Sequence, residues 1–234
     1  MKTSRHRTVG VIGGMGPEAT VDLMQRVIRA TPARDDEDHV HMIVDNNPQV
    51  PSRIRALIDG TGESPVPCLR GMARGLEASG ADFLVIPCNT AHAYFDEIAS
   101  AVSIPVLHMI RLTAEVVLAD SPSPRTVGIL ASNAVLKTAL YEDVFRGLGV
   151  DVLYPQDGFQ ERIMKAIRDI KTGSIGPVEN EALFDAAQDL LDLGAEALIV
   201  ACTELSLLED ALPEIERAYD AAQVLAEAIV KAAT

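Results

Sequence analysis

Few cysteines and few basic residues are present, and each shortage excludes a class of protein. Three cysteines in 234 residues are too few, and odd in number, for a scaffold held by disulfides. They fit a reducing compartment, where a cysteine is either buried filler or a reactive group. Only 20 lysines and arginines stand against 34 aspartates and glutamates, a net charge of −14. This balance disfavours a protein that binds the nucleic-acid backbone.

Long apolar runs are also missing. No segment approaches the roughly 18 apolar residues of a transmembrane helix. The basic N-terminal segment is followed by only four apolar residues before Gly13 and Gly14, which is too short for a signal peptide. We therefore expect a cytoplasmic protein with neither a membrane nor a nucleic-acid partner.

Short β-branched runs alternate with longer amphipathic segments along the chain. Strands are predicted at 8–12, 40–45, 82–86, 105–109, 126–130, 150–154 and 197–201. Helices are predicted at 17–30, 66–79, 90–101, 134–147, 159–172 and 179–193. Strands without polar alternation, separated by helix-length segments, indicate parallel sheets covered on both faces. The sequence thus predicts an α/β, doubly wound fold.

An internal repeat divides the chain into two halves. Residues 80–88, GADFLVIPC, align with residues 194–202, GAEALIVAC, at an offset of 114 residues. A second match aligns TVGVI with TVGIL at an offset of 118. Nearly equal offsets predict two halves of similar topology. We expect an N-terminal α/β domain over 1–112, onto which a C-terminal helix at 221–234 packs, and a second α/β domain over 113–220.

Each repeated word ends in a cysteine, Cys88 or Cys202, at the carboxyl end of a strand. Ligands bind at this edge of open α/β sheets, and a following helix start would lower the pKa of the thiol. Asn89, Thr90 and Thr203 would supply hydrogen-bond donors there. Two halves facing one cleft would place the thiols on opposite sides of a small molecule. One thiolate could then remove a proton from a chiral carbon while the opposite thiol returns one to the other face.

Several motifs together resemble those of a known family. They are GGMGPEAT at 13–20, NNPQVPSR at 46–53, PCNTAH at 87–92, IMKAIRDIKTG at 163–173 and ACTEL at 201–205. The chain carrying them resembles the aspartate/glutamate racemase superfamily and, within it, the cofactor-independent aspartate racemase branch. The resemblance covers the chain from about residue 8 to the C-terminal helix.

The resemblance implies two pseudo-symmetric domains with the active site in the cleft between them. It implies a homodimer that converts L-aspartate to D-aspartate without pyridoxal phosphate, another cofactor or a metal. Cys88 and Cys202 would be the catalytic acid and base, and Arg53 and Lys171 would bind the side-chain carboxylate. The substrate contacts are predicted to be Met15, Asn46, Gln49, Arg53, Asn89, Thr90, Lys171, Thr203 and Glu204.

Other hypotheses remain open. Related activities are a glutamate or broad-specificity racemase, a hydantoin racemase, a maleate isomerase or an arylmalonate decarboxylase, and a protein of another class would bind a small carboxylate without catalysis. A redox pair is disfavoured because no C-x-x-C motif is present, and no zinc-ligand spacing occurs. The loop that starts at Gly14 fits a dinucleotide-binding pattern only weakly, and such a site would leave the two cysteines unexplained, so we interpret the loop as a close-approach turn that lines the cleft. Cys68 has no counterpart in the other half and is predicted to be a packing residue. His92 and Glu204 could each either assist a thiol or serve the local structure.

Overall fold

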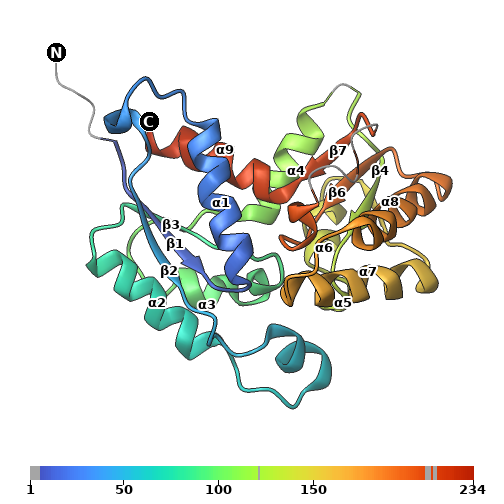
Figure 1. The fold of residues 1–234 in the computed structure, drawn as a ribbon, viewed down its shortest axis with the longest axis horizontal. Helices are drawn as coiled ribbons and strands as arrows, with labels where there is room; N and C mark the ends of the chain where they lie inside the picture. Colours follow the sequence, from blue (N-terminus) through green and yellow to red (C-terminus); the bar gives the residue numbers. More distant parts are fainter. Residues whose placement is uncertain (1–5, 121, 209–211, 213–214) are drawn as a thin grey trace. The chain divides into compact units, whose positions relative to one another are not determined.

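A computed structural model describes residues 6–120, 122–208, 212 and 215–234 of the chain. The chain forms two compact units. Unit 1 comprises the residues up to Met109 together with Ala222–Thr234, and unit 2 comprises Ile110–Ala221. Each unit contains one parallel sheet with helices packed against it (Figure 1).

Unit 1 is built on a sheet whose strands run in the order β2-β1-β3. Its strands are β1 (Val9–Gly13), β2 (Met42–Asn46) and β3 (Phe83–Val85). Its helices are α1 (Pro17–Ala30), α2 (Val66–Ala78), α3 (Phe95–Ala99) and α9 (Ala221–Ala233). Short 3₁₀ helices lie at Asp36–Asp38 and Thr90–Tyr94, and a π-helical turn lies at Arg55–Asp59.

Unit 2 has a parallel sheet in the order β5-β4-β6-β7. Its strands are β4 (Thr126–Leu130), β5 (Asp151–Leu153), β6 (Ala197–Val200) and β7 (Ala218–Asp220). Its helices are α4 (Met109–Ala119), α5 (Asn133–Lys137), α6 (Leu140–Arg146), α7 (Asp157–Lys171) and α8 (Pro177–Asp192), and a 3₁₀ helix lies at Leu205–Leu207.

The two sheets share one topology. In each, the first strand pairs with the second on one side and with the third on the other, all in parallel. The strands β1, β3 and β6 are buried along their whole length, and β4 is buried from its second residue on. This confirms the α/β fold with parallel sheets that the sequence predicts.

The repeat extends to the packing of the core. A Cβ placed on Gly10 of β1 would lie 3.1 Å from Cβ of Leu76, which belongs to α2. A Cβ placed on Gly128 of β4 would lie 3.0 Å from Cβ of Leu190, which belongs to α8. A glycine in the central strand therefore lets the covering helix approach closely in both units.

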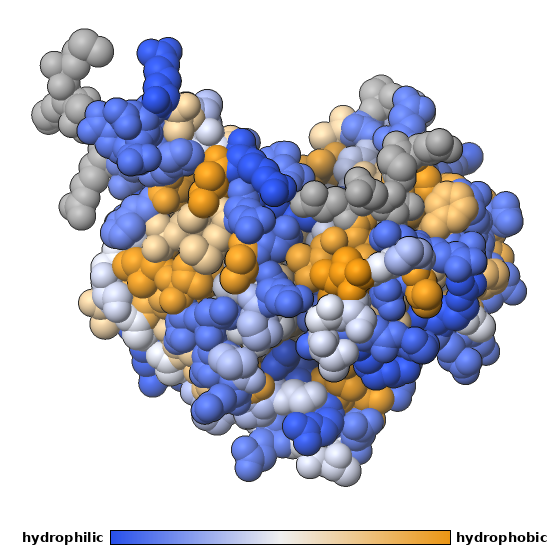
Figure 2. Space-filling model, viewed as in Figure 1, coloured by the Kyte–Doolittle hydropathy of each residue, from blue (hydrophilic) through white to orange (hydrophobic). Residues whose placement is uncertain are grey.

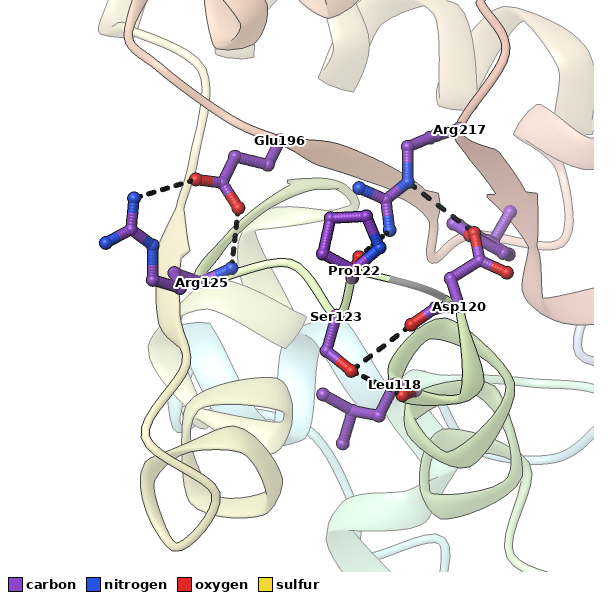
Figure 3. Close-up of polar contacts among 8 residues, drawn as sticks. Leu118, Asp120, Pro122, Ser123, Arg125, Glu196 and Arg217 are labelled. Carbon is purple, nitrogen blue, oxygen red and sulfur yellow. Dashed lines mark hydrogen bonds and ion pairs between the residues drawn. The ribbon is translucent and has the colours of Figure 1, made fainter.

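The first letters of each repeated word serve the fold. Gly80 and Gly194 follow helices α2 and α8 with φ angles of +98° and +97°, a region that favours glycine. Asp82 and Glu196 each accept, at 2.7 Å, the backbone N–H of the residue that precedes the first strand of their unit. Figure 3 shows the second of these contacts, between Glu196 and Arg125. These roles are structural and do not account for the cysteine that ends each word.

The strand predictions need two corrections. The strand predicted at 105–109 is reduced to a bridge between Val106 and Leu84, because α4 already begins at Met109. Conversely, β7 lies in a polar segment for which no strand was predicted. Polar side chains in and beside it have partners: the Asp220 carboxylate of β7 accepts the Ser206 hydroxyl, and Arg217, the residue before β7, lies 3.5 Å from the Asp120 carboxylate (Figure 3). An edge strand of this kind lacks the apolar pattern that sequence analysis detects.

Two predicted helices are interrupted. The segment at 90–101 forms a 3₁₀ helix followed by α3, and the segment at 134–147 forms α5 and α6. The second break coincides with Ala139, whose φ of +51° is rare for a residue with a side chain. The remaining predicted helices agree with the structure to within two residues at each end.

Helix α9 completes unit 1 although it is the last element of the chain. The backbone N–H of Arg7 donates to the carbonyl of Ala233 at 2.9 Å. The Arg26 guanidinium, ion-paired with Asp22 at 2.6 Å on α1, also donates to the Gln223 side chain at 3.4 Å. These bonds tie α9 to β1 and α1 (Figure 1).

The surface agrees with the acidic, mixed composition. Hydrophilic side chains cover much of the face drawn in Figure 2, and hydrophobic side chains gather there in separate patches. None of the helices in the described part of the chain has the length and apolarity needed to cross a bilayer.

Candidate active site

The carboxyl edge of the unit 1 sheet gathers most of the residues predicted for that half. Parallel strands end at the same edge, so the loops after β1, β2 and β3 meet there. Met15 follows β1 and is buried, with 3% of its surface exposed. Asn46 ends β2 and Gln49 follows it, and both are exposed, whereas Cys88 follows β3 and is buried, with 6% exposed.

The backbone of Cys88 is held by local hydrogen bonds. Its N–H donates to the carbonyl of Ile86 at 2.8 Å, and its carbonyl accepts the N–H of Ala91 at 3.2 Å. The next two residues are the buried Asn89 and the half-buried Thr90, which begins a 3₁₀ helix. Cys88 therefore lies on a short, fixed turn, and it packs in the hydrophobic cluster of unit 1.

His92 is a structural residue of this turn. Its Nε2 accepts the N–H of Met109 at 3.1 Å, so Nδ1 carries the ring proton and donates to the Cys88 carbonyl at 2.9 Å. Burial, reinforced by the neighbouring His108 ring, lowers the pKa of His92 to about 3. A neutral imidazole with both nitrogens engaged positions the Cys88 turn and is not available to relay a proton.

Backbone crowding explains the glycine-rich loop after β1. A Cβ on Gly14, whose φ is +89°, would lie 2.2 Å from the backbone of Asn47. The Gly14 N–H donates to the Thr20 hydroxyl at 2.9 Å, which fixes the loop to α1. Cys68, the unrepeated cysteine, accepts the Asn47 amide at 3.5 Å behind this loop. These contacts explain why residue 14 is a glycine, and the explanation does not require a nucleotide-binding role for the loop.

Arg53 donates mainly to its own loop. Its Nη1 lies 3.1 Å from the carbonyl of Val50 and 3.0 Å from that of Pro51. Its Nε is buried and has no hydrogen-bond partner within the described residues. Because a buried N–H is costly to leave unpaired, this atom is the part of Arg53 suited to an anionic ligand.

At the carboxyl edge of unit 2, the structure brings together three of the predicted residues. The Cys202 thiol donates to Glu204 Oε2 at 3.2 Å, and Lys171 Nζ lies 3.0 Å from Glu204 Oε1. Cys202, Glu204 and the intervening Thr203 are all buried. Lys171, the last residue of α7, keeps 38% of its side chain exposed. The result is a thiol, a carboxylate and an ammonium in series.

These neighbours hold Cys202 in its protonated form, which corrects one expectation. Burial raises the pKa of the Cys202 thiol well above its ordinary value, and the charge of Glu204 raises it further. Lys171 lowers this pKa but does not cancel the other two effects. The predicted lowering by a helix start is wrong here because only a three-residue 3₁₀ helix follows, at Leu205–Leu207.

Sequence reasoning missed the polar groups behind Cys202. Ser206 donates its hydroxyl to Asp220 Oδ1 at 2.6 Å and its N–H to the Cys202 carbonyl at 3.1 Å, which joins this turn to β7. Tyr141 of α6 is fully buried and hydrogen-bonded to Thr113. Burial, then the charges of Asp220 and Cys202, raise the pKa of Tyr141. Tyr141 and Asp220 have no counterpart in the motifs and gave no signal.

The donor set of both edges is thiol, carboxylate, amide and hydroxyl. Within the described residues, no group of three or more His, Cys, Asp and Glu side chains could hold a metal ion.

Comparison with known proteins decides the family. The profile of the Asp/Glu/hydantoin racemase family matches residues 12–229. The chain belongs to this family. Its membership confirms the predicted racemase superfamily and isomerase class.

Full-length relatives agree with this assignment. The chain is 29% identical over 226 residues to the broad specificity amino-acid racemase RacX of Bacillus subtilis, covering 95% of this chain and 96% of RacX. It is 31% identical to the Picrophilus torridus aspartate racemase, with a TM-score of 0.82 over 97% of this chain and 94% of that one. Glutamate racemase RacE1 of Bacillus anthracis is 20% identical, with a TM-score of 0.67 over 97% and 81% of the two chains, and shares the fold.

Proposed function

We propose that this racemase inverts the α-carbon of a free amino acid by proton exchange between Cys88 and Cys202, with aspartate as its substrate. The observation that carries the proposal is the occurrence of a buried cysteine at the same edge of two parallel sheets whose first three strands are ordered alike. The family membership and the aspartate racemase neighbour support it. In the proposal, the two carboxyl edges close around one substrate molecule.

The reaction needs one thiolate and one thiol at the start of each turnover. The thiolate of one cysteine takes the α-proton, and the electron pair left behind moves onto the α-carboxylate. The opposite thiol then donates its proton to the other face of the carbon and becomes the thiolate. The Cys202 thiol donates to Glu204 in the substrate-free protein, so we assign Cys202 as the acid, and the opposite Cys88 as the base, in the direction that starts from this arrangement.

Hydrogen-bond donors lower the barrier to this proton removal. An α-proton is a very weak acid, so the negative charge that develops on the α-carboxylate must be stabilised by fixed donors. We assign this role to Asn89, Thr90 and Thr203, which adjoin the cysteines in the chain. Met15, Asn46 and Gln49 line the same edge of unit 1 and would complete the contacts to the substrate.

Cationic groups would recognise the second carboxylate of aspartate. Arg53 offers its Nε, which has no hydrogen-bond partner among the residues that the structure describes, and Lys171 offers the ammonium of a partly exposed side chain. A guanidinium and an ammonium both suit a carboxylate, and a local positive site is needed because the net charge of −14 repels a dianion at long range.

A broad-specificity racemase is the second candidate, and one observation favours it. Both cations already have partners, since Arg53 donates to two carbonyls and Lys171 pairs with Glu204. The RacX relative is named for broad specificity. Chiral chromatography after incubation with each of the common L-amino acids separates the two candidates. Conversion of aspartate well above all others supports the proposal, comparable conversion of several supports the second candidate, and conversion of none refutes both.

A further inference from the structure

Glu204 is the residue whose position the two-thiol mechanism leaves partly unexplained. A carboxylate beside Cys202 needs only one oxygen to accept the thiol proton, and Oε2 does so at 3.2 Å. The second oxygen, Oε1, is buried and turned to Lys171 at 3.0 Å. Glu204 thus binds the very ammonium that the aspartate hypothesis assigns to the substrate.

Lys171 can serve both partners because of where it lies. It ends α7, lies two residues before Gly173, whose φ is +89°, and keeps 38% of its side chain exposed. Its charge acts on Cys202, so a substrate whose α-carbon lies against that thiol is within the reach of its flexible stem. Glu204 is held by burial, with 6% exposed, whereas the Lys171 side chain remains partly exposed.

We propose that Glu204 occupies Lys171 in the substrate-free protein as an internal stand-in for a substrate side-chain carboxylate. A substrate that carries such a carboxylate must compete with Glu204 for the ammonium, and a substrate without one leaves the pair intact. Glu204 is therefore a specificity-determining residue that weakens the advantage of acidic amino acids over neutral ones. This inference rests on the proposed function.

The test compares two substrates of equal shape, L-aspartate and L-asparagine, in the wild type and in E204Q. The glutamine keeps the size of the side chain but removes the charge that holds Lys171. We expect the KM for aspartate to fall roughly fivefold, the effect of one partly exposed ion pair. The KM for asparagine should stay unchanged. Any effect on Cys202 changes kcat for both substrates alike, so the ratio of the two KM values isolates the pairing.

Two further variants control for charge and for folding. E161Q removes a carboxylate from the exposed surface of α7, ten residues and about 15 Å along the helix from Lys171. It should leave the ratio of the two KM values unchanged. K171M removes the ammonium at a partly exposed position and should raise the KM for aspartate alone, which tests the inference even if E204Q does not fold.

Calorimetric titration of both amino acids in the C88A background, in which we expect no racemisation, gives the same comparison as dissociation constants. The inference is overturned if the ratio of the aspartate and asparagine constants is the same in the wild type and in E204Q. It is also overturned if this ratio changes as much in E161Q as in E204Q. Either result leaves the proposed function intact. A wild type that converts no amino acid overturns the proposed function. Binding of neither amino acid to either protein overturns both.

Discussion

The buried His92 should make the stability of the protein depend on pH in a way that one substitution removes. Its pKa is about 3 in the folded protein against 6.5 for an ordinary histidine, chiefly because of burial. Between these values the unfolded chain binds a proton that the folded protein does not, so the free energy of unfolding falls as the pH falls below 6.5. Between pH 7 and pH 5 this linkage costs about 2 kcal/mol.

The substitution H92Q removes the titrating ring and keeps an acceptor for the Met109 N–H. At pH 7 the variant should be less stable than the wild type by about 1 kcal/mol, for the lost bond to the Cys88 carbonyl. At pH 5 the difference in stability should vanish or reverse, because only the wild type contains the histidine whose protonation favours the unfolded chain.

Urea unfolding followed by circular dichroism at the two pH values measures this difference. H6Q, at an exposed histidine, is the matched control and should follow the wild type at both pH values. If H92Q and the wild type lose equal stability between pH 7 and pH 5, His92 is not held neutral by the contacts described.

Two further predictions concern the repeat and Cys202. G128A should lower the free energy of unfolding in urea by about 1–3 kcal/mol, because the new Cβ would lie 2.8 Å from a Leu198 methyl group. G75A has open space on α2 and should raise this free energy by about 0.5–1 kcal/mol. Equal effects of the two substitutions would contradict the packing described. E204Q should let iodoacetamide alkylate Cys202 at a lower pH than in the wild type, because the carboxylate raises the pKa of this thiol. Peptide mass spectrometry reads this out, and an unchanged profile would remove Glu204 from the control of Cys202.

The sequence predicts the fold well because its strongest signals are local and repeated. Gly10 and Gly128 mark the close approach of a helix to each central strand, and the repeated words carry the turn that leads to each cysteine. Such signals depend on neighbours in the chain. The strand β7 was missed because its polar side chains are satisfied by groups distant in sequence, such as Ser206, whose hydroxyl donates to Asp220.

The properties of the site were harder to predict than its residues. Cys202, Glu204 and Lys171 were all singled out from motifs, but their serial arrangement depends on how α7 meets the turn after β6. The pKa of Cys202 follows from burial and from that arrangement, so a helix-start argument gave the wrong direction. The role of His92 depends on a donor that lies seventeen residues further along the chain, the N–H of Met109, so the sequence around His92 could not predict it.

Hydrogen–deuterium exchange tests the central claim, that Cys88 and Cys202 trade one proton across the substrate. L-aspartate, or the amino acid that the chromatographic panel identifies, is incubated in D₂O with wild type, C88A, C202A, the double variant and C68A, and is followed by proton NMR and chiral chromatography. The wild type and C68A should form the D-enantiomer carrying deuterium at the α-carbon, and C88A and C202A should each form none. Racemisation that persists in the double variant would contradict the account.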